Sequence, residues 1–195
     1  MQPRQYHERT LIVIKPDGVQ RMLVGDIIHR LERIGLKMVA SKMLVATPAH
    51  IEAHYTLDPE WKMKTGTKAI KGYTDKGLKP PSTDPLKVVA IVLKNLVRYM
   101  SSGPVIAMVW EGAHAVEIVR KLVGSTEPLS SDVGTIRGDY MLDSYRLSDH
   151  NERAIYNLIH ASGSVKEAND EIKHWFKEGE VMDYNVILET VIYGK

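Results

Sequence analysis

Two short runs of consecutive apolar residues constrain the fold of this chain more than any other feature. Leu11–Ile14 is apolar and rich in β-branched residues, and residues 104–110 read PVIAMVW. A continuous apolar run of this length is typical of a strand buried within a sheet. The first run is followed by Pro16-Asp17-Gly18, which predicts a turn. We therefore expect both runs to be core strands.

Segments with a helical pattern separate the predicted strands. In residues 24–35, Ile27, Leu31 and Ile34 recur at helical spacing, and Gly35 stands where a helix C-cap is expected. Similar patterns predict further helices over 47–55, 87–100, 114–124 and 164–176, and further strands over 36–45 and 156–159. This order suits a small α/β sandwich, in which helices pack on a mostly antiparallel sheet.

Two of the predicted helices begin with a recognisable cap. Thr47 and Pro48 are suited to the N-cap and the first helical position. Ser164, with Glu167 three residues later, forms the sequence of a capping box. These signals fix where the two helices start.

Two segments interrupt the regular pattern. Residues 58–85 are rich in lysine and contain four prolines and three glycines without a sustained period, so we interpret them as an insertion on the surface. Within it, Gly72 and Gly77 have the spacing of a phosphate-binding P-loop, but Leu78 and Lys79 replace the required Lys and Ser/Thr. A basic loop is the favoured interpretation. Residues 140–154 are polar and predict a second, smaller insertion.

Composition excludes several kinds of site and partner. The 195 residues suit one domain, and 26 basic against 24 acidic residues give a net charge of only +2. No strong field favours nucleic acid or an anionic membrane. The chain has no cysteine, which excludes disulfides, thiolate nucleophiles and Cys-ligated metals. We expect a soluble, cytoplasmic protein with no membrane partner and no obligatory nucleic acid.

One histidine and one glutamate lie where the fold could bring them together. In the last helix, Ala168, Ile172 and Trp175 share a narrow arc, and Glu171 lies at its edge. A carboxylate leaning toward the core needs a partner, because burying an unpaired charge is costly. His160 lies just before the turn that starts this helix. Such a contact would fix the tautomer of His160, which would be available for chemistry or would simply satisfy Glu171.

The other histidines predict no site. They lie in expected tails, helix faces and loops, and His50 and His54 have an i, i+4 spacing but lack the neighbouring Glu of a zinc protease motif. We therefore expect no metal bound by protein ligands.

At this point the sequence resembles a known family. Asn157-Leu-Ile-His160-Ala-Ser162, with Glu171 beyond it, is similar to the active-site signature of nucleoside diphosphate kinases. Four further segments resemble the same family in the same order: ERTLIVIKPDGVQRMLVGDII, SGPVIAMVWEG, GSTEP and GTIRGD. The resemblance leaves out the two insertions, near 58–95 and 140–154.

The resemblance implies a fold and an assembly. It implies an α+β fold of the ferredoxin-like type, a βαββαβ core whose mostly antiparallel four-stranded sheet carries packed helices. Residues 1–195 would form a single domain of this type with two insertions. The family also implies a homo-oligomer, with a hexamer favoured and a tetramer as the alternative.

The resemblance implies a ping-pong transfer of the γ-phosphoryl group from a nucleoside triphosphate to a nucleoside diphosphate. His160 would be the nucleophile and form a phosphohistidine, Glu171 would orient it, and Tyr55 would hold its environment. The implied nucleotide contacts are Lys15, Arg120, Thr126, Arg137 and Asn157. Mg²⁺ would bind through the nucleotide phosphates, without a protein ligand.

Three positions depart from the family pattern. The aromatic residue expected to stack on the base falls in the first insertion, where Trp61 is a candidate and Val92 or Leu93 is an equal alternative. Ala154 stands where an apolar base contact is expected, and Gly163 stands where the family has aspartate. Base preference is therefore open, while Ser164 still caps the following helix.

Two other hypotheses compete with an active kinase. A non-catalytic relative could bind nucleotides or nucleic acid through the lysine-rich insertion, although the small net charge counts against this. A phosphorelay carrier also uses a histidine, but it is typically a helical bundle without a sheet.

Overall fold

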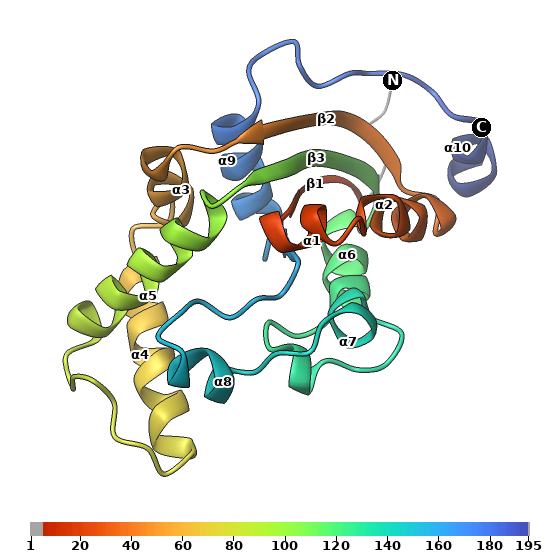
Figure 1. The fold of residues 1–195 in the computed structure, drawn as a ribbon. Helices are drawn as coiled ribbons and strands as arrows, with labels where there is room; N and C mark the ends of the chain where they lie inside the picture. Colours follow the sequence, from red (N-terminus) through yellow and green to blue (C-terminus); the bar gives the residue numbers. More distant parts are fainter. Residues whose placement is uncertain (1–5, 195) are drawn as a thin grey trace.

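The computed structural model describes residues 6–194, and its centre is a four-stranded antiparallel sheet (Figure 1). The strands lie in the order β2-β3-β1-β4, and each neighbouring pair is antiparallel. Their bounds are His7–Ile14 for β1, Lys37–Val45 for β2, Pro104–Ala113 for β3 and Ile159–Ala161 for β4. The ends of the predicted single domain, residues 1–5 and residue 195, lie outside the described residues.

Five of the helices are those that the sequence predicts: α2 (Val24–Arg33), α3 (Pro48–Tyr55), α5 (Pro85–Met100), α6 (Ala115–Val123) and α9 (Val165–Trp175). With α2 between β1 and β2 and α6 between β3 and β4, the chain follows the expected βαββαβ order. The sheet also excludes the helical bundle of a phosphorelay carrier.

Helices cover both faces of the sheet, which explains the unbroken apolar runs. Ile12 and Ile14 of β1 are fully buried in one core cluster together with residues of α2 and α6. Leu11 and Val13 point the other way, into a second cluster with residues of α3, α5 and α9. A central strand with no solvent-facing side therefore needs apolar residues at every position.

Both predicted helix caps are present. The Thr47 hydroxyl accepts a hydrogen bond from the His50 amide at 3.2 Å, and the Ser164 hydroxyl accepts one from the Glu167 amide at 3.1 Å. The Glu167 carboxylate accepts from the Gly163 amide at 3.0 Å. A Cβ atom on Gly163 would lie 2.6 Å from Glu167 Oε2, so a larger residue here would displace this carboxylate.

The first insertion is not the loop that the sequence predicts. It contains the 15-residue helix α4 (Trp61–Asp75), which packs along α5 (Figure 1). Gly66 allows the close approach, since a Cβ atom there would lie 2.1 Å from the Pro85 carbonyl oxygen. The helix escapes prediction because Gly66 is its only buried residue, so no apolar stripe marks one of its faces. Gly72 lies inside this helix, which agrees with the rejection of a P-loop.

The last strand begins later than predicted. The sequence places it over 156–159, whereas β4 covers Ile159–Ala161 and pairs with β1 only there. Leu158 has a φ of 66°, a conformation that a branched side chain rarely adopts. Because this backbone is not extended, the strand begins only at the next residue, Ile159. His160 therefore lies inside the strand, opposite Val13, and not just after it.

Four short helices have no counterpart in the prediction. They are α1 (Pro16–Gln20) in the expected turn, α7 (Ile136–Tyr140) in the expected loop, α8 (Tyr145–His150) in the second insertion, and α10 (Ile187–Tyr193); a 3₁₀ turn, η1, covers Pro128–Ser130. Helices of five to seven residues are too short for a hydrophobic period to reveal them.

Across residues 6–194, no helix has both the length and the apolar character that crossing a membrane requires.

Candidate active site

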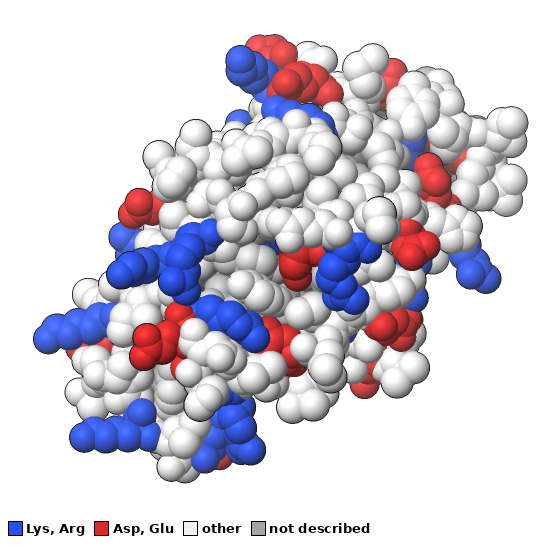
Figure 2. All heavy atoms as spheres, viewed as in Figure 1, with Lys and Arg blue, Asp and Glu red and all other residues white. Residues whose placement is uncertain are grey.

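A cleft of about 1220 Å³ opens beside β4. All nine of the predicted site residues line it: Lys15, Tyr55, Trp61, Arg120, Thr126, Arg137, Asn157, His160 and Glu171. They come from five helices, one strand and three connecting segments that lie far apart in the sequence. Basic side chains outnumber acidic ones along the cleft, and Figure 2 shows Lys and Arg gathered over the part of the molecule that holds α4 and α5 in Figure 1. The cleft therefore suits an anionic ligand.

His160 and Glu171 form the contact that the sequence suggests. His160 Nε2 lies 2.7 Å from Glu171 Oε1, and the Glu171 side chain is only 3% exposed. The Ser162 hydroxyl donates to the other carboxylate oxygen, Oε2, at 2.5 Å. With both oxygens engaged as acceptors, Glu171 accepts a hydrogen bond from Nε2–H, which makes Nδ1 the unprotonated nitrogen of the neutral ring. Ser162 is fully buried, so its hydroxyl holds the Glu171 carboxylate in place.

His54 lies directly against this pair, although the sequence gave it no role. Its ring centroid is 4.6 Å from that of His160, and its Nδ1 accepts a hydrogen bond from the Trp175 indole at 3.1 Å. Burial, followed by the neighbouring His160, lowers the pKa of His54 well below 6.5, so the ring is neutral. Periodicity could not reveal this contact because Trp175 lies 121 positions further along the chain.

His54, His160 and Glu171 have the spacing of possible metal ligands, but three of their ligand atoms already have hydrogen-bond partners. One ligand atom from each of His54, His160 and Glu171 lies within 4.8 Å of the other two. The His54 acceptor is used by Trp175, and His160 is hydrogen-bonded to Glu171.

Lys15 and Asn157 form a buried pair at the floor of the cleft. Lys15 follows β1, is 4% exposed and donates from Nζ to Asn157 Oδ1 at 2.7 Å. The side-chain nitrogen of Asn157, Nδ2, donates in turn to the backbone carbonyl oxygen of Thr126 at 2.8 Å. Burial, followed by the charge of Arg137, lowers the pKa of Lys15 to about 7. A bound anion would favour the charged ammonium.

Arg137 is held by the main chain. Its guanidinium donates to four carbonyl oxygens, those of Gly124, Ser125, Asn157 and Ile159, at 2.6 to 3.1 Å. A guanidinium has five N–H groups, so one remains for a ligand. Burial, followed by the charge of Arg120, lowers the pKa of Arg137 to about 10, which leaves it cationic at neutral pH. Arg137 therefore fixes the loop that carries Thr126, while Arg120 is exposed on α6.

Aromatic and apolar side chains line the region next to α4. The rings of Tyr55 and Trp61 lie 5.5 Å apart between centroids, and burial raises the pKa of the Tyr55 hydroxyl. Val92 and Ala154 also line the cleft. Leu93 is 9% exposed and is absent from the lining, so it is excluded as a base contact. Trp61 and Val92 remain as candidates.

Residues from the two predicted insertions enclose part of this cleft. Lys76, at the end of α4, places Nζ 5.1 Å from the centroid of Tyr145 in α8. Arg98 of α5 donates to the Glu152 carbonyl oxygen at 3.0 Å. The α4–α5 pair and the segment 140–154 are thus in contact.

Comparison with known proteins identifies the family. The family model described as nucleoside diphosphate kinase matches residues 8–66 and 89–181. The chain belongs to the nucleoside diphosphate kinase family. The model leaves residues 67–88, the end of α4 and the start of α5, unmatched and covers 140–154 without a break. The predicted family is confirmed, and the catalytic interpretation is favoured over a non-catalytic relative.

Individual relatives agree along most of the chain. Nucleoside diphosphate kinase from Pyrobaculum aerophilum is 49% identical over 180 residues, which cover 90% of this chain and 98% of that protein. The corresponding enzyme from Borreliella burgdorferi is 38% identical over 177 residues, covering 91% and 92%.

Solved structures of the same family share the fold. The structure of the NDP kinase from Pyrobaculum aerophilum has a TM-score of 0.87 at 48% identity and covers 91% of this chain and 100% of its own. A transition-state mimic of nucleoside diphosphate kinase from Borrelia burgdorferi, with bound vanadate and ADP, has a TM-score of 0.77 at 36% identity, covering 95% and 96%. The predicted α+β fold class is confirmed.

Proposed function

We propose that this chain transfers the γ-phosphoryl group of a nucleoside triphosphate to a nucleoside diphosphate, through a phosphohistidine formed on Nδ1 of His160. The observation that carries the proposal is the 2.7 Å contact between His160 Nε2 and Glu171, which assigns the proton to Nε2 and leaves Nδ1 with a lone pair in a cationic cleft. The transition-state mimic of the Borrelia relative, with vanadate and ADP, supports the same chemistry.

Each half-reaction exchanges one bond to phosphorus. The Nδ1 lone pair bonds to the γ-phosphorus while the bond to the β–γ bridging oxygen breaks, and the diphosphate leaves with that electron pair. In the second half-reaction a terminal oxygen of another diphosphate bonds to phosphorus, and the P–N bond breaks. Nε2 keeps its proton throughout and donates it in a hydrogen bond to Glu171, whose negative charge stabilises the positive charge that develops on the ring.

The basic residues supply the remaining stabilisation. Phosphoryl transfer spreads negative charge over the equatorial oxygens, so positioned cations provide most of the stabilisation of the transition state. Lys15, Arg120 and the free N–H of Arg137 are suited to the phosphates, and the exposed Thr126 can donate to them. Asn157 would contact the sugar, Tyr55 would hold the histidine environment, and Trp61 is our candidate for the base.

The nucleotide would bind as its Mg²⁺ complex. The carboxylates nearest the nucleophile fit this arrangement, because Glu171 is engaged by His160 and Ser162, and Glu167 accepts from the Gly163 amide. The ion would take its oxygen ligands from the phosphates and water and would neutralise part of their charge.

Labelling with a γ-labelled triphosphate tests the proposal. Without an acceptor, the chain should incorporate label that is stable in base, labile in acid and confined to the peptide containing His160. Addition of an unlabelled nucleoside diphosphate should discharge it into new triphosphate, as a ping-pong mechanism requires. A label that is stable in acid, or one that the diphosphate does not discharge, would overturn the proposal.

Replacing Glu171 with Gln should lower kcat by about 10- to 100-fold, the usual cost of losing a partner that orients a reactive histidine. An amide cannot accept from both His160 and Ser162, since one of its ends is a donor. Steady-state kinetics should show the loss in kcat with little change in KM, because the phosphate-binding cations remain. Ser162→Ala should lower kcat less, because Glu171 keeps its contact with His160. A Glu171→Gln enzyme with normal kcat would contradict the orienting role.

We also propose that the protein is a homo-oligomer and acts in the cytoplasm. β2 is at the edge of the sheet, and Met43 and Val45 on it are 61% and 65% exposed, which suits contact with a second copy. A hexamer is favoured over a tetramer by the family resemblance alone. Light scattering of the purified chain would give the number of subunits, and a monomer would refute this proposal.

A further inference from the structure

Tyr99 contacts Lys15 and two residues near it, Asp17 and Asn157. Tyr99 is in the last turn of α5 and is 6% exposed. It donates to Asp17 Oδ1 at 2.6 Å, while Asp17 Oδ2 accepts from the Leu158 amide at 3.3 Å. The backbone amide nitrogen of Asn157 lies 3.4 Å from the same phenol oxygen. Tyr99 thus connects α5 to the start of α1 and to the residues that precede β4.

The ring of Tyr99 also contacts Lys15. Lys15 Nζ lies 5.1 Å from the ring centroid and donates to Asn157. Asp17 is only two positions from Lys15, yet within residues 6–194 the two form no ion pair, because the donors to the Asp17 oxygens are the neutral phenol and a backbone amide. A partly buried carboxylate close to an ammonium would otherwise pair with it.

We infer that Tyr99 is a positioning residue: its hydroxyl holds the Asp17 carboxylate away from Lys15 and so keeps the Lys15 ammonium available to a bound phosphate. This inference rests on the proposed role of Lys15 in nucleotide binding. An ion pair with Asp17 would both neutralise the ammonium and draw it away from Asn157.

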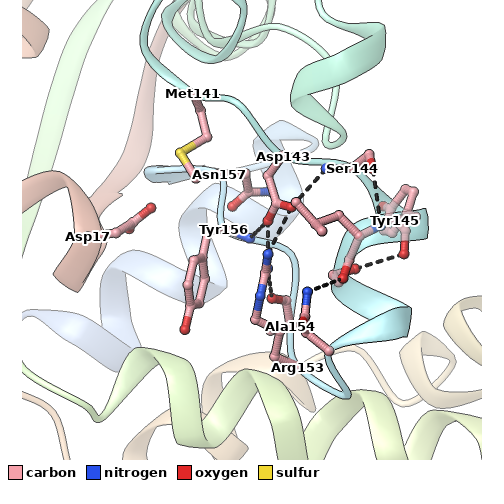
Figure 3. Close-up of polar contacts among 12 residues, drawn as sticks. Asp17, Met141, Asp143, Ser144, Tyr145, Arg153, Ala154, Tyr156 and Asn157 are labelled. Carbon is pink, nitrogen blue, oxygen red and sulfur yellow. Dashed lines mark hydrogen bonds and ion pairs between the residues drawn. The ribbon is translucent and has the colours of Figure 1, made fainter.

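The Tyr99 ring packs against Tyr156, which Arg153 contacts in turn. Its centroid lies 4.7 Å from that of Tyr156, and the guanidinium carbon of Arg153 lies 4.4 Å from the Tyr156 centroid. Arg153 forms two hydrogen bonds to Asp143, at 2.6 and 3.0 Å, and the Tyr156 amide donates to the same carboxylate (Figure 3). The segment 143–156 therefore fixes the ring whose hydroxyl holds Asp17.

The charges around Lys15 determine the direction in which its pKa should shift when one of them is moved or removed. Burial and Arg137 of α7 lower the pKa of Lys15 to about 7, and Asp17 of α1 opposes them. His54 of α3 has a strongly lowered pKa and stays neutral, and burial raises the pKa of Tyr99, so its hydroxyl stays protonated. The ammonium is therefore lost as the pH rises through about 7, and phosphate binding should weaken above it.

The test is the pH dependence of kcat/KM in Tyr99→Phe, Asp17→Asn and the double variant. Tyr99→Phe keeps the ring but frees Asp17 to pair with Lys15, so kcat/KM at the acidic plateau should fall about 10-fold and the alkaline limb should move up by about one pH unit. Asp17→Asn removes the opposing charge, so its limb should move down. The double variant should show no upward shift.

A matched control and a direct measurement complete the test. Tyr156→Phe keeps the stacked ring, and its hydroxyl has no hydrogen bond within the described part of the chain, so its pH profile should match the parent. NMR titration of lysine labelled at Cε, assigned with Lys15→Arg, follows Lys15 without turnover. An unchanged Lys15 titration in Tyr99→Phe, or a shift of equal sign in Asp17→Asn, would overturn the inference. Opposite shifts in a chain that forms no phosphohistidine would uphold it while refuting the proposed reaction.

Discussion

A chain in which Gln replaces His160 should lose kcat/KM by at least about 10⁴-fold, a loss typical of removing the nucleophile from a covalent mechanism. Gln can still donate to Glu171 through its side-chain amide, so the buried carboxylate keeps a partner and the fold is preserved. What disappears is the Nδ1 lone pair. The measurement is the rate of phosphoryl exchange between a triphosphate and a diphosphate, with nucleotide affinity followed separately by calorimetry.

The control for this variant is the neighbouring imidazole. His54→Gln removes the other buried ring next to Glu171 but leaves His160 in place, so it should retain the phosphoenzyme while losing stability, because the Trp175 indole loses its ring acceptor. Nucleotide affinity in His160→Gln should change less than about 10-fold, since Lys15, Arg120 and Arg137 remain. If His160→Gln retained exchange activity and His54→Gln lost its label, the nucleophile would be His54.

The parts of the fold that the sequence could predict are those with a strong period. The buried strands β1 and β3 have unbroken apolar runs, and α2 and α6 have a clear apolar face, so local pattern and tertiary environment agree. The helix α4 is different, since it lies along α5 and the cleft with little buried surface. Its lysines and glycines then have the composition of a loop. The start of β4 could not be predicted because it depends on the left-handed backbone of Leu158.

In the candidate site, too, contacts between residues close in the sequence could be predicted, and contacts between distant residues could not. His160 and Glu171 are close in sequence and joined by one turn, so helical geometry alone could place them together. Arg137 and Asn157 were assigned through the family resemblance, and nothing in their local sequence shows that one donates to the carbonyl of the other. Tyr99, Asp17 and His54 were missed for the same reason. Their partners lie 58 to 141 positions away, where no local period reaches.

The structure also shows why the cleft can combine tight positioning with open access. The residues at its floor, Lys15, Arg137 and Asn157, are each less than 7% exposed and bind the main chain or one another. Arg120 and Thr126 are exposed and have room to adapt to a ligand. A buried, preorganised floor costs little reorganisation during the transfer, while exposed side chains allow nucleotides to enter and leave twice in each cycle.

Arg137→Lys should damage both stability and activity, although it conserves the charge. The guanidinium satisfies four carbonyl oxygens from two segments, Gly124–Ser125 and the strand start at Asn157 and Ile159. An ammonium is a single point with three donors and cannot span them, so buried carbonyls lose their partners at about 1–3 kcal/mol each. We expect unfolding to become easier by about 3 kcal/mol and kcat/KM to fall by about 100-fold or more, because the loop that carries Thr126 is released.

Arg120→Lys is the matched control, because Arg120 is exposed on α6 and retains its positive charge in the variant. It should leave the melting temperature unchanged and lower kcat/KM by about 10-fold, through loss of a bidentate phosphate contact. Arg137→Lys should instead lower the melting temperature by about 6–12 °C, the shift that 3 kcal/mol produces in a chain of this size. Thermal melts and steady-state kinetics on the two variants separate the roles. Equal melting temperatures in both variants would mean that the carbonyl contacts of Arg137 do not hold the loop, and that its contribution is charge alone.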